Sequence, residues 1–188
     1  MKRDACFRVL AELMPSAIVV ATYTSAFEWI AIRPHPLNYV CVGAMGLASS
    51  HALGLALALP ERRIVVLDGD GSLLMNLGSL VSIAAAAPRN LVHFVSQNGS
   101  YEANGGHPIP GLSQVDFVGI ATSAGYRQAE SFSQLEDFKR AIAHLLQADG
   151  PVFVNLHLEP GETPPVADYE YIHSARARHE FAAALALR

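Results

Sequence analysis

Apolar residues in this chain form short continuous runs, and between the runs they recur every three or four positions. A short apolar run bounded by turn residues is typical of a strand buried on both faces, and the longer periodic segments are typical of helices. The alternation predicts an α/β fold, with a doubly wound, mostly parallel sheet of about six strands and helices on both faces. The expected strands are residues 17–21, 38–42, 64–67, 91–95, 126–129 and 152–156.

Helices are expected in the periodic segments around these strands. Residues 99–113 are rich in Gly and Pro and are expected to form a long loop of the kind that often carries function. The expected helices are residues 3–14, a segment through Phe27, Trp29 and Ile30, then 43–59, 73–87, 114–124, 133–147 and 174–187.

The composition fits one domain that packs against another subunit. Of the 188 residues, 51% are hydrophobic and only 16% are charged, a low charged fraction for the surface of a small monomer. We therefore expect a large buried subunit interface. The net charge of −4 argues against a nucleic acid or a membrane surface as the partner.

The sequence shows no targeting signal and no functional cysteine pattern. No apolar segment of a signal peptide follows the basic residues Lys2 and Arg3, and no run of about 20 apolar residues occurs, so a cytoplasmic location is expected. Cys6 and Cys41 lack metal-binding or redox spacing, and Cys41 is expected to be a core thiol.

Polar residues follow two of the predicted strands. The run at 64–67 ends in Asp68-Gly69-Asp70-Gly71, and the run at 91–95 is followed by Asn98. Ligands of open α/β sheets bind at these strand ends. The carboxylate of Asp70 and the amide oxygen of Asn98 are hard ligands that suit Mg²⁺ or Ca²⁺.

The residues around Asp70 suit a phosphate group. Gly69 and Gly71 allow a sharp turn and a close approach of the backbone to a ligand. Ser72 is expected to open the next helix, where free N–H groups favour an anion. The sequence therefore predicts a site for a magnesium-bound diphosphate.

The spacing of this motif resembles that of a known family. Gly69-Asp70-Gly71, followed after 26 residues by Asn98, is similar to the metal–diphosphate motif of thiamine diphosphate-dependent enzymes. Over most of its length the chain also resembles the β subunit of sulfopyruvate decarboxylase and the matching half of phosphonopyruvate decarboxylase. The residues that carry this closer similarity are 43–50, 53–60, 68–77 and Gly105-Gly106.

The resemblance implies thiamine diphosphate and Mg²⁺ as cofactors and one binding domain over residues 1–188, with a helical tail from about 160 to 188. It implies that Asp70, Asn98 and the backbone carbonyl of Ser100 bind the metal. Gly43 matches a glycine whose carbonyl contacts the aminopyrimidine, and Met45 matches a side chain that wedges between the two cofactor rings. The full set of cofactor residues implied is Thr24, Ser25, Gly43, Met45, Gly69, Asp70, Gly71, Ser72, Asn98, Ser100 and Tyr101.

Some of these assignments keep an alternative. Thr24 stands where many relatives carry Gly, and Thr24 and Ser25 could simply cap the following helix. His107 is the candidate catalytic residue, as a proton donor or substrate ligand, but it could equally be a solvated loop histidine. His51, within the helix expected at 43–59, is more readily explained as a packed, hydrogen-bonded side chain.

Thiamine enzymes also need a second kind of domain, which holds the aminopyrimidine and supplies a glutamate, and no such domain is found in this sequence. The resemblance therefore implies a pyrimidine-binding α-type partner subunit, in an α2β2 or larger assembly. The function implied is a subunit of a 2-oxo acid decarboxylase, a carbon–carbon lyase for sulfopyruvate or phosphonopyruvate. The alternatives are an acetolactate synthase-like carboligase subunit and a non-catalytic binding subunit that keeps the fold.

Overall fold

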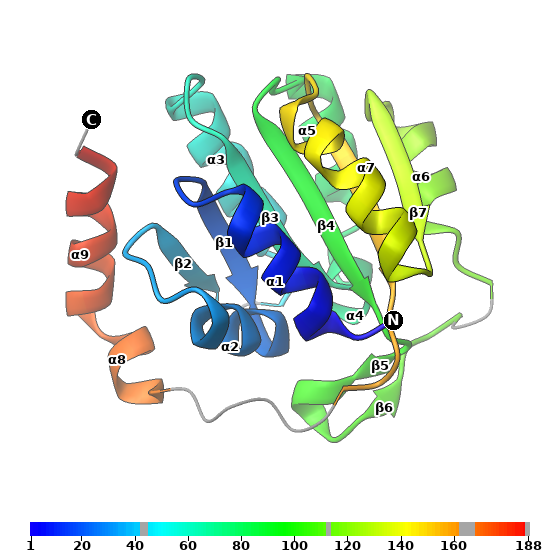
Figure 1. Cartoon of the computed structure of the whole chain (residues 1–188), viewed down its shortest axis with the longest axis horizontal. Coiled ribbons are helices and arrows are strands. Elements are labelled where there is room, and N and C mark those ends of the chain that lie inside the picture. Colours follow the sequence, from blue (N-terminus) through cyan, green and yellow to red (C-terminus); the bar gives the residue numbers. More distant parts are fainter. Residues whose placement is uncertain (42–44, 112–113, 162–167, 187–188) are drawn as a thin grey trace.

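The computed structural model describes residues 1–41, 45–111, 114–161 and 168–186. Within these ranges, six strands form one parallel sheet in the order β2-β1-β3-β4-β8-β7 (Figure 1). This confirms the predicted doubly wound α/β fold, and every pairing in the main sheet is parallel. The strands are β1 (Ile18–Thr22), β2 (Asn38–Cys41), β3 (Ile64–Gly69), β4 (Leu91–Gln97), β7 (Gln128–Phe132) and β8 (Val152–His157).

Helices cover both faces of this sheet (Figure 1). One face packs against α1 (Arg3–Leu13), α2 (Tyr23–Ile32) and α7 (Leu135–Gln147). The other packs against α3 (Ala48–Ala58), α5 (Gly78–Ala86) and α6 (Phe117–Ala124). Because β1 and β4 are buried on both sides, apolar residues follow one another in these strands instead of alternating with exposed polar ones, and His93, which interrupts the run of β4, is itself fully buried.

The C-terminal helices α8 (Tyr169–His173) and α9 (Ala175–Ala186) lie beyond the edge strand β2 (Figure 1). Phe181 of α9 is buried and its ring contacts Tyr39 of β2, with the ring centroids 5.2 Å apart. The final helix therefore docks on the domain and covers the edge of the sheet. Among the described residues, no helix has both the length and the apolar character required to cross a bilayer.

The helix expected at 114–124 begins only at Phe117, and the strand expected at 126–129 is β7, which lies later in the chain. Two other predicted helices differ more from their expected limits. The helix expected at 73–87 is divided into α4 (Asp70–Leu74) and α5, and in the break Asn76 donates a hydrogen bond from its side chain to the carbonyl of Gly46 (2.7 Å). The helix expected at 43–59 begins only at Ala48, because Gly46 has φ +82°, a left-handed conformation that no helix can contain. Gly43 lies outside the described residues.

The long loop expected at 99–113 contains ordered elements. Strands β5 (Ser100–Tyr101) and β6 (His107–Pro108) pair as an antiparallel hairpin, and a 3₁₀-helix, η1 (Glu102–Asn104), joins them. Strands of two residues have too little periodicity to be predicted from sequence. The hairpin lies at the end of the sheet where β3 and β4 finish (Figure 1).

Both cysteines are expected to resist alkylation in the native protein. Cys6 and Cys41 are buried, as predicted for Cys41, and burial raises the pKa of each thiol to about 12. Since only the thiolate reacts, about one thiol in ten thousand is reactive at pH 8. Mass spectrometry after iodoacetamide treatment should find two labels in denaturant and none in the folded chain. Rapid labelling of the folded chain would contradict this burial.

Candidate functional site

A cavity of about 50 Å³ lies at the C-terminal ends of β1, β3 and β4, under the β5–β6 hairpin. Strands β3 and β4 run in register, with Gly69 opposite Ser96, so the residues that follow them meet at one edge of the sheet. Every cofactor residue implied by the sequence and described by the structure lines this cavity. These residues are Thr24, Ser25, Met45, Gly69, Asp70, Gly71, Ser72, Asn98, Ser100 and Tyr101.

Asp70 lies at the centre of this arrangement and is only 1% exposed. One carboxylate oxygen accepts the N–H of Gly71 (2.8 Å), and the other accepts the N–H of Gly99 (2.7 Å). The second bond joins the end of β3 to the end of β4. Burial raises the pKa of Asp70, the backbone N–H donors oppose that rise, and the charge of Glu102 adds to it.

The oxygen atoms at this edge of the sheet fit a hard divalent cation. A carboxylate has about four lone-pair sites. The two backbone N–H groups that donate to Asp70 leave some of these sites for a metal ion. The side-chain oxygen of Asn98 accepts the N–H of Ser100 (2.9 Å). In the described ranges no group of three or more His, Cys, Asp or Glu side chains could hold a metal ion. A cation here would therefore combine one carboxylate with neutral oxygens and ligand phosphates, as Mg²⁺ does.

The turn between β1 and α2 brings helix N–H groups to the cavity. Tyr23 has φ +44°, an uncommon conformation for a residue with a side chain. It starts α2, and the side chain of the N-cap residue makes no capping hydrogen bond, so the N–H groups of the first turn can bind an anion. Thr24 and Ser25 lie inside this turn rather than at its cap position, which is held by Thr22.

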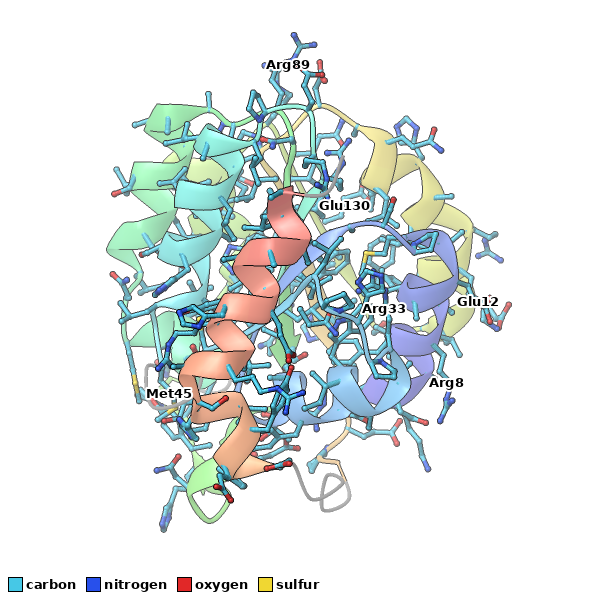
Figure 2. The ribbon with its side chains drawn as sticks, turned by 90° about the vertical axis from the view of Figure 1, so that its left-hand side faces the viewer. Arg8, Glu12, Arg33, Met45, Arg89 and Glu130 are labelled. Atoms are coloured by element: carbon cyan, nitrogen blue, oxygen red, sulfur yellow. The ribbon has the colours of Figure 1, made fainter. Side chains whose placement is uncertain are left out.

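The segment that carries Met45 is held by residues of α4 and of the break after it. Gly46 donates its N–H to the hydroxyl of Ser72 (2.9 Å), and its carbonyl accepts the Asn76 side chain. Ser72 was expected to open a helix; α4 instead begins at Asp70, and Ser72 fixes this neighbouring turn. Met45 consequently lies at the end of the molecule that carries the hairpin (Figure 2).

The side chain of Tyr101 lies directly over Gly71. A Cβ atom on Gly71 would come within 2.4 Å of the Tyr101 ring, a distance that no such pair of atoms tolerates. The absence of a side chain at Gly71 therefore permits this close approach. The two residues close one side of the cavity.

Two histidines singled out in the sequence do not line the cavity. His107 is exposed on β6 and does not line it. His51, on α3, stacks on the ring of Tyr39 (5.2 Å between centroids), and its Nδ1 is 3.1 Å from the carbonyl oxygen of Leu47. Conversely, Arg3, Tyr23 and Glu102 line the cavity without having been assigned to the site from the sequence. No local pattern identifies Arg3, since α1 reaches the cavity only through tertiary packing.

The fold and the site together define an α/β domain with a polar cavity at the adjacent C-terminal ends of parallel strands. Residues 20–156 match the family described as "Thiamine pyrophosphate enzyme, C-terminal TPP binding domain". The chain belongs to this family, which confirms the resemblance inferred from its motifs.

Two similar proteins are decarboxylases of small 2-oxo acids. The chain is 41% identical over 181 residues to a phosphonopyruvate decarboxylase of Streptomyces hygroscopicus, covering 93% of this chain but 44% of the relative. It is 38% identical over 168 residues to the sulfopyruvate decarboxylase subunit beta of Methanothermobacter thermautotrophicus, covering 89% of this chain and 87% of the subunit. The chain therefore spans less than half of the first relative and most of the second.

A solved structure shares the fold. The thiamine diphosphate-dependent 4-hydroxybenzoylformate decarboxylase of Rhodococcus jostii RHA1 superposes with a TM-score of 0.68 at 24% sequence identity. The match covers 87% of this chain and 33% of that enzyme. At this identity the likeness concerns the fold alone.

Proposed function

We propose that this chain is the magnesium- and diphosphate-binding subunit of a thiamine diphosphate-dependent decarboxylase that acts on sulfopyruvate or phosphonopyruvate. The observation that carries the proposal is the meeting of Asp70 and Asn98 at the ends of β3 and β4, in a domain of this family. The similarity to a sulfopyruvate decarboxylase subunit over 87% of that subunit's length supports the choice of substrate class.

In this proposal the metal would be held by Asp70, Asn98 and the carbonyl of Ser100. The first turn of α2, with Thr24 and Ser25, would bind the diphosphate through its N–H groups and hydroxyls. Thiamine diphosphate, when bound, supplies the electron sink for loss of CO₂ from a 2-oxo acid.

The remaining assigned residues would act around the cofactor rings. Met45 and Gly43 would set the orientation of the rings, and Gly69 and Gly71 would let the backbone approach the diphosphate. His107 lies outside the cavity, so a role in proton transfer requires a partner that completes the site beside the hairpin.

The catalytic glutamate and the pyrimidine site would come from an α-type partner in an α2β2 or larger assembly. The chain spans less than half of the phosphonopyruvate decarboxylase it resembles but most of a sulfopyruvate decarboxylase subunit beta, and the second similarity supports a separate α-type partner. Leu47 and Met75 are 43% and 53% exposed, and they lie on the two segments that hold the Met45 turn. Exposed apolar side chains next to the cavity are expected where a partner packs.

Product analysis of the complex tests this proposal. The chain, co-expressed with a pyrimidine-binding partner, should convert sulfopyruvate or phosphonopyruvate to the corresponding aldehyde and CO₂ only when thiamine diphosphate and Mg²⁺ are present. An acyloin product would instead favour the carboligase. A complex that forms but neither binds the cofactor nor reacts would favour the non-catalytic binding subunit.

A further inference from the structure

Arg3 joins three segments at the rim of the cavity. It lies at the start of α1, and its side chain is only 6% exposed. Its Nε donates to Glu28 of α2 (2.5 Å), and its Nη1 donates to Glu102 of η1 (2.8 Å). The N-terminal end of α1 and the β5–β6 hairpin lie at the same corner of the molecule (Figure 1).

The hairpin next to Arg3 has few bonds of its own. Gly106 donates its N–H to the carbonyl of Tyr101 (3.0 Å), and Ile109 donates to the carbonyl of Gly99 (3.0 Å). A short two-stranded hairpin is marginally stable by itself in water. Its closed position over the cavity therefore depends on contacts with the rest of the domain.

Glu102 provides such a contact on two sides. One carboxylate oxygen accepts from Arg3, and the other accepts the N–H of Gly161, in the segment after β8 (2.9 Å). Glu102 directly follows Ser100 and Tyr101, the two residues of the hairpin that carry a candidate metal ligand and the ring over Gly71. Fixing Glu102 therefore fixes both of them.

We propose that Arg3 is a positioning residue that fastens the Ser100–Asn104 segment over the cavity through its ion pair with Glu102. The role of this segment in cofactor binding rests on the proposed function. The ion pair by which Arg3 holds the segment over the cavity is independent of that function. The pair is sheltered, with Arg3 and Glu102 at 6% and 16% exposure, so loss of one partner leaves a poorly solvated charge. An arginine suits the position because its rigid fork donates to two carboxylates at once.

Hydrogen exchange of the full chain without cofactor tests the ion pair directly. In Arg3→Met, the amides of Gly106 and Ile109 are expected to exchange about tenfold faster, the factor that follows from losing one charge-assisted hydrogen bond. Arg3→Lys, which can keep a single bond to Glu102, should give an intermediate rate. The double variant Arg3→Met with Glu102→Gln should exchange no faster than the faster single variant, because both remove the same bond.

Matched controls separate local opening from general loss of stability. Arg8→Met removes an arginine of the same helix that points into solvent (Figure 2) and pairs with Asp4. Glu28→Gln leaves the bond between Arg3 and Glu102 intact. Both should keep wild-type exchange at Gly106 and Ile109. The amide of Phe94, in the central strand β4, reports global opening. Unchanged rates in Arg3→Met, or equal acceleration at Phe94, would overturn the proposal.

Cofactor affinity gives the second readout. In the complex with the partner, Arg3→Met is expected to weaken binding of Mg²⁺ and thiamine diphosphate about tenfold by titration calorimetry, the same factor as the lost bond. Faster exchange with unchanged affinity would overturn the link between the closed segment and the cofactor. If the wild-type complex binds no cofactor, the proposed function fails, while the exchange rates still decide whether Arg3 holds the segment.

Discussion

The Asp70→Asn variant is expected to lose the rise in melting temperature that Mg²⁺ and thiamine diphosphate give the wild-type complex. Asp70 is the carboxylate of the proposed metal site, it is buried, and its position is fixed by the N–H groups of Gly71 and Gly99. An amide cannot supply the negative charge that a hard cation requires. A ligand at about 100 times its Kd stabilises the folded state by about 2.7 kcal/mol, and this increment should disappear.

The informative quantity is the difference between melting with and without ligand. Burial raises the pKa of Asp70, so the substitution also changes the cost of burying this side chain in the ligand-free protein. An amide nitrogen would moreover face one of the two N–H donors that the carboxylate now accepts. Both effects shift the baseline melting temperature and cancel in the ligand-dependent difference.

Asp137→Asn is the matched control for this variant. Asp137 is exposed on α7 and pairs with Arg140, away from the cavity. Its variant should keep the full ligand-dependent rise. If Asp70→Asn showed a rise as large as that of Asp137→Asn, the assignment of Asp70 as a metal ligand would be wrong.

Phe153→Ala is expected to lower the free energy of unfolding by about 3–5 kcal/mol, through lost apolar burial and the cavity left behind. Phe153 is fully buried in β8, and its ring stands edge-on to those of His93 (5.4 Å) and Tyr126 (5.7 Å). Such a loss is a large part of the roughly 5–15 kcal/mol that keeps a domain folded.

Urea unfolding of the wild type and of Phe153→Ala measures this loss of stability. Leu57→Ala serves as the control, because Leu57 is 56% exposed on α3 and its truncation should change the free energy by less than about 0.5 kcal/mol. Similar midpoints for Phe153→Ala and Leu57→Ala would contradict the burial of Phe153 between His93 and Tyr126.

The fold class follows from local patterns in the sequence. Strands β1, β3, β4 and β8 consist largely of consecutive apolar residues because helices cover both of their faces, and that pattern is visible without coordinates. The meeting of Asp70 and Asn98 follows as well, since residues that end neighbouring parallel strands must lie at one edge. The family motif added the residues of the α2 turn and Met45.

Other features were decided only by the tertiary structure. The break between α4 and α5 accompanies a bond from Asn76 to a carbonyl 30 residues earlier, and Arg3 reaches the cavity through a bond to Glu102, 99 residues away. The exposure of His107 on β6 is likewise seen only in the folded chain. Periodicity reports which side of an element is buried, but a single hydrogen bond between distant segments leaves no repeat in the sequence. Such contacts depend on where whole elements pack, and only the folded chain fixes that.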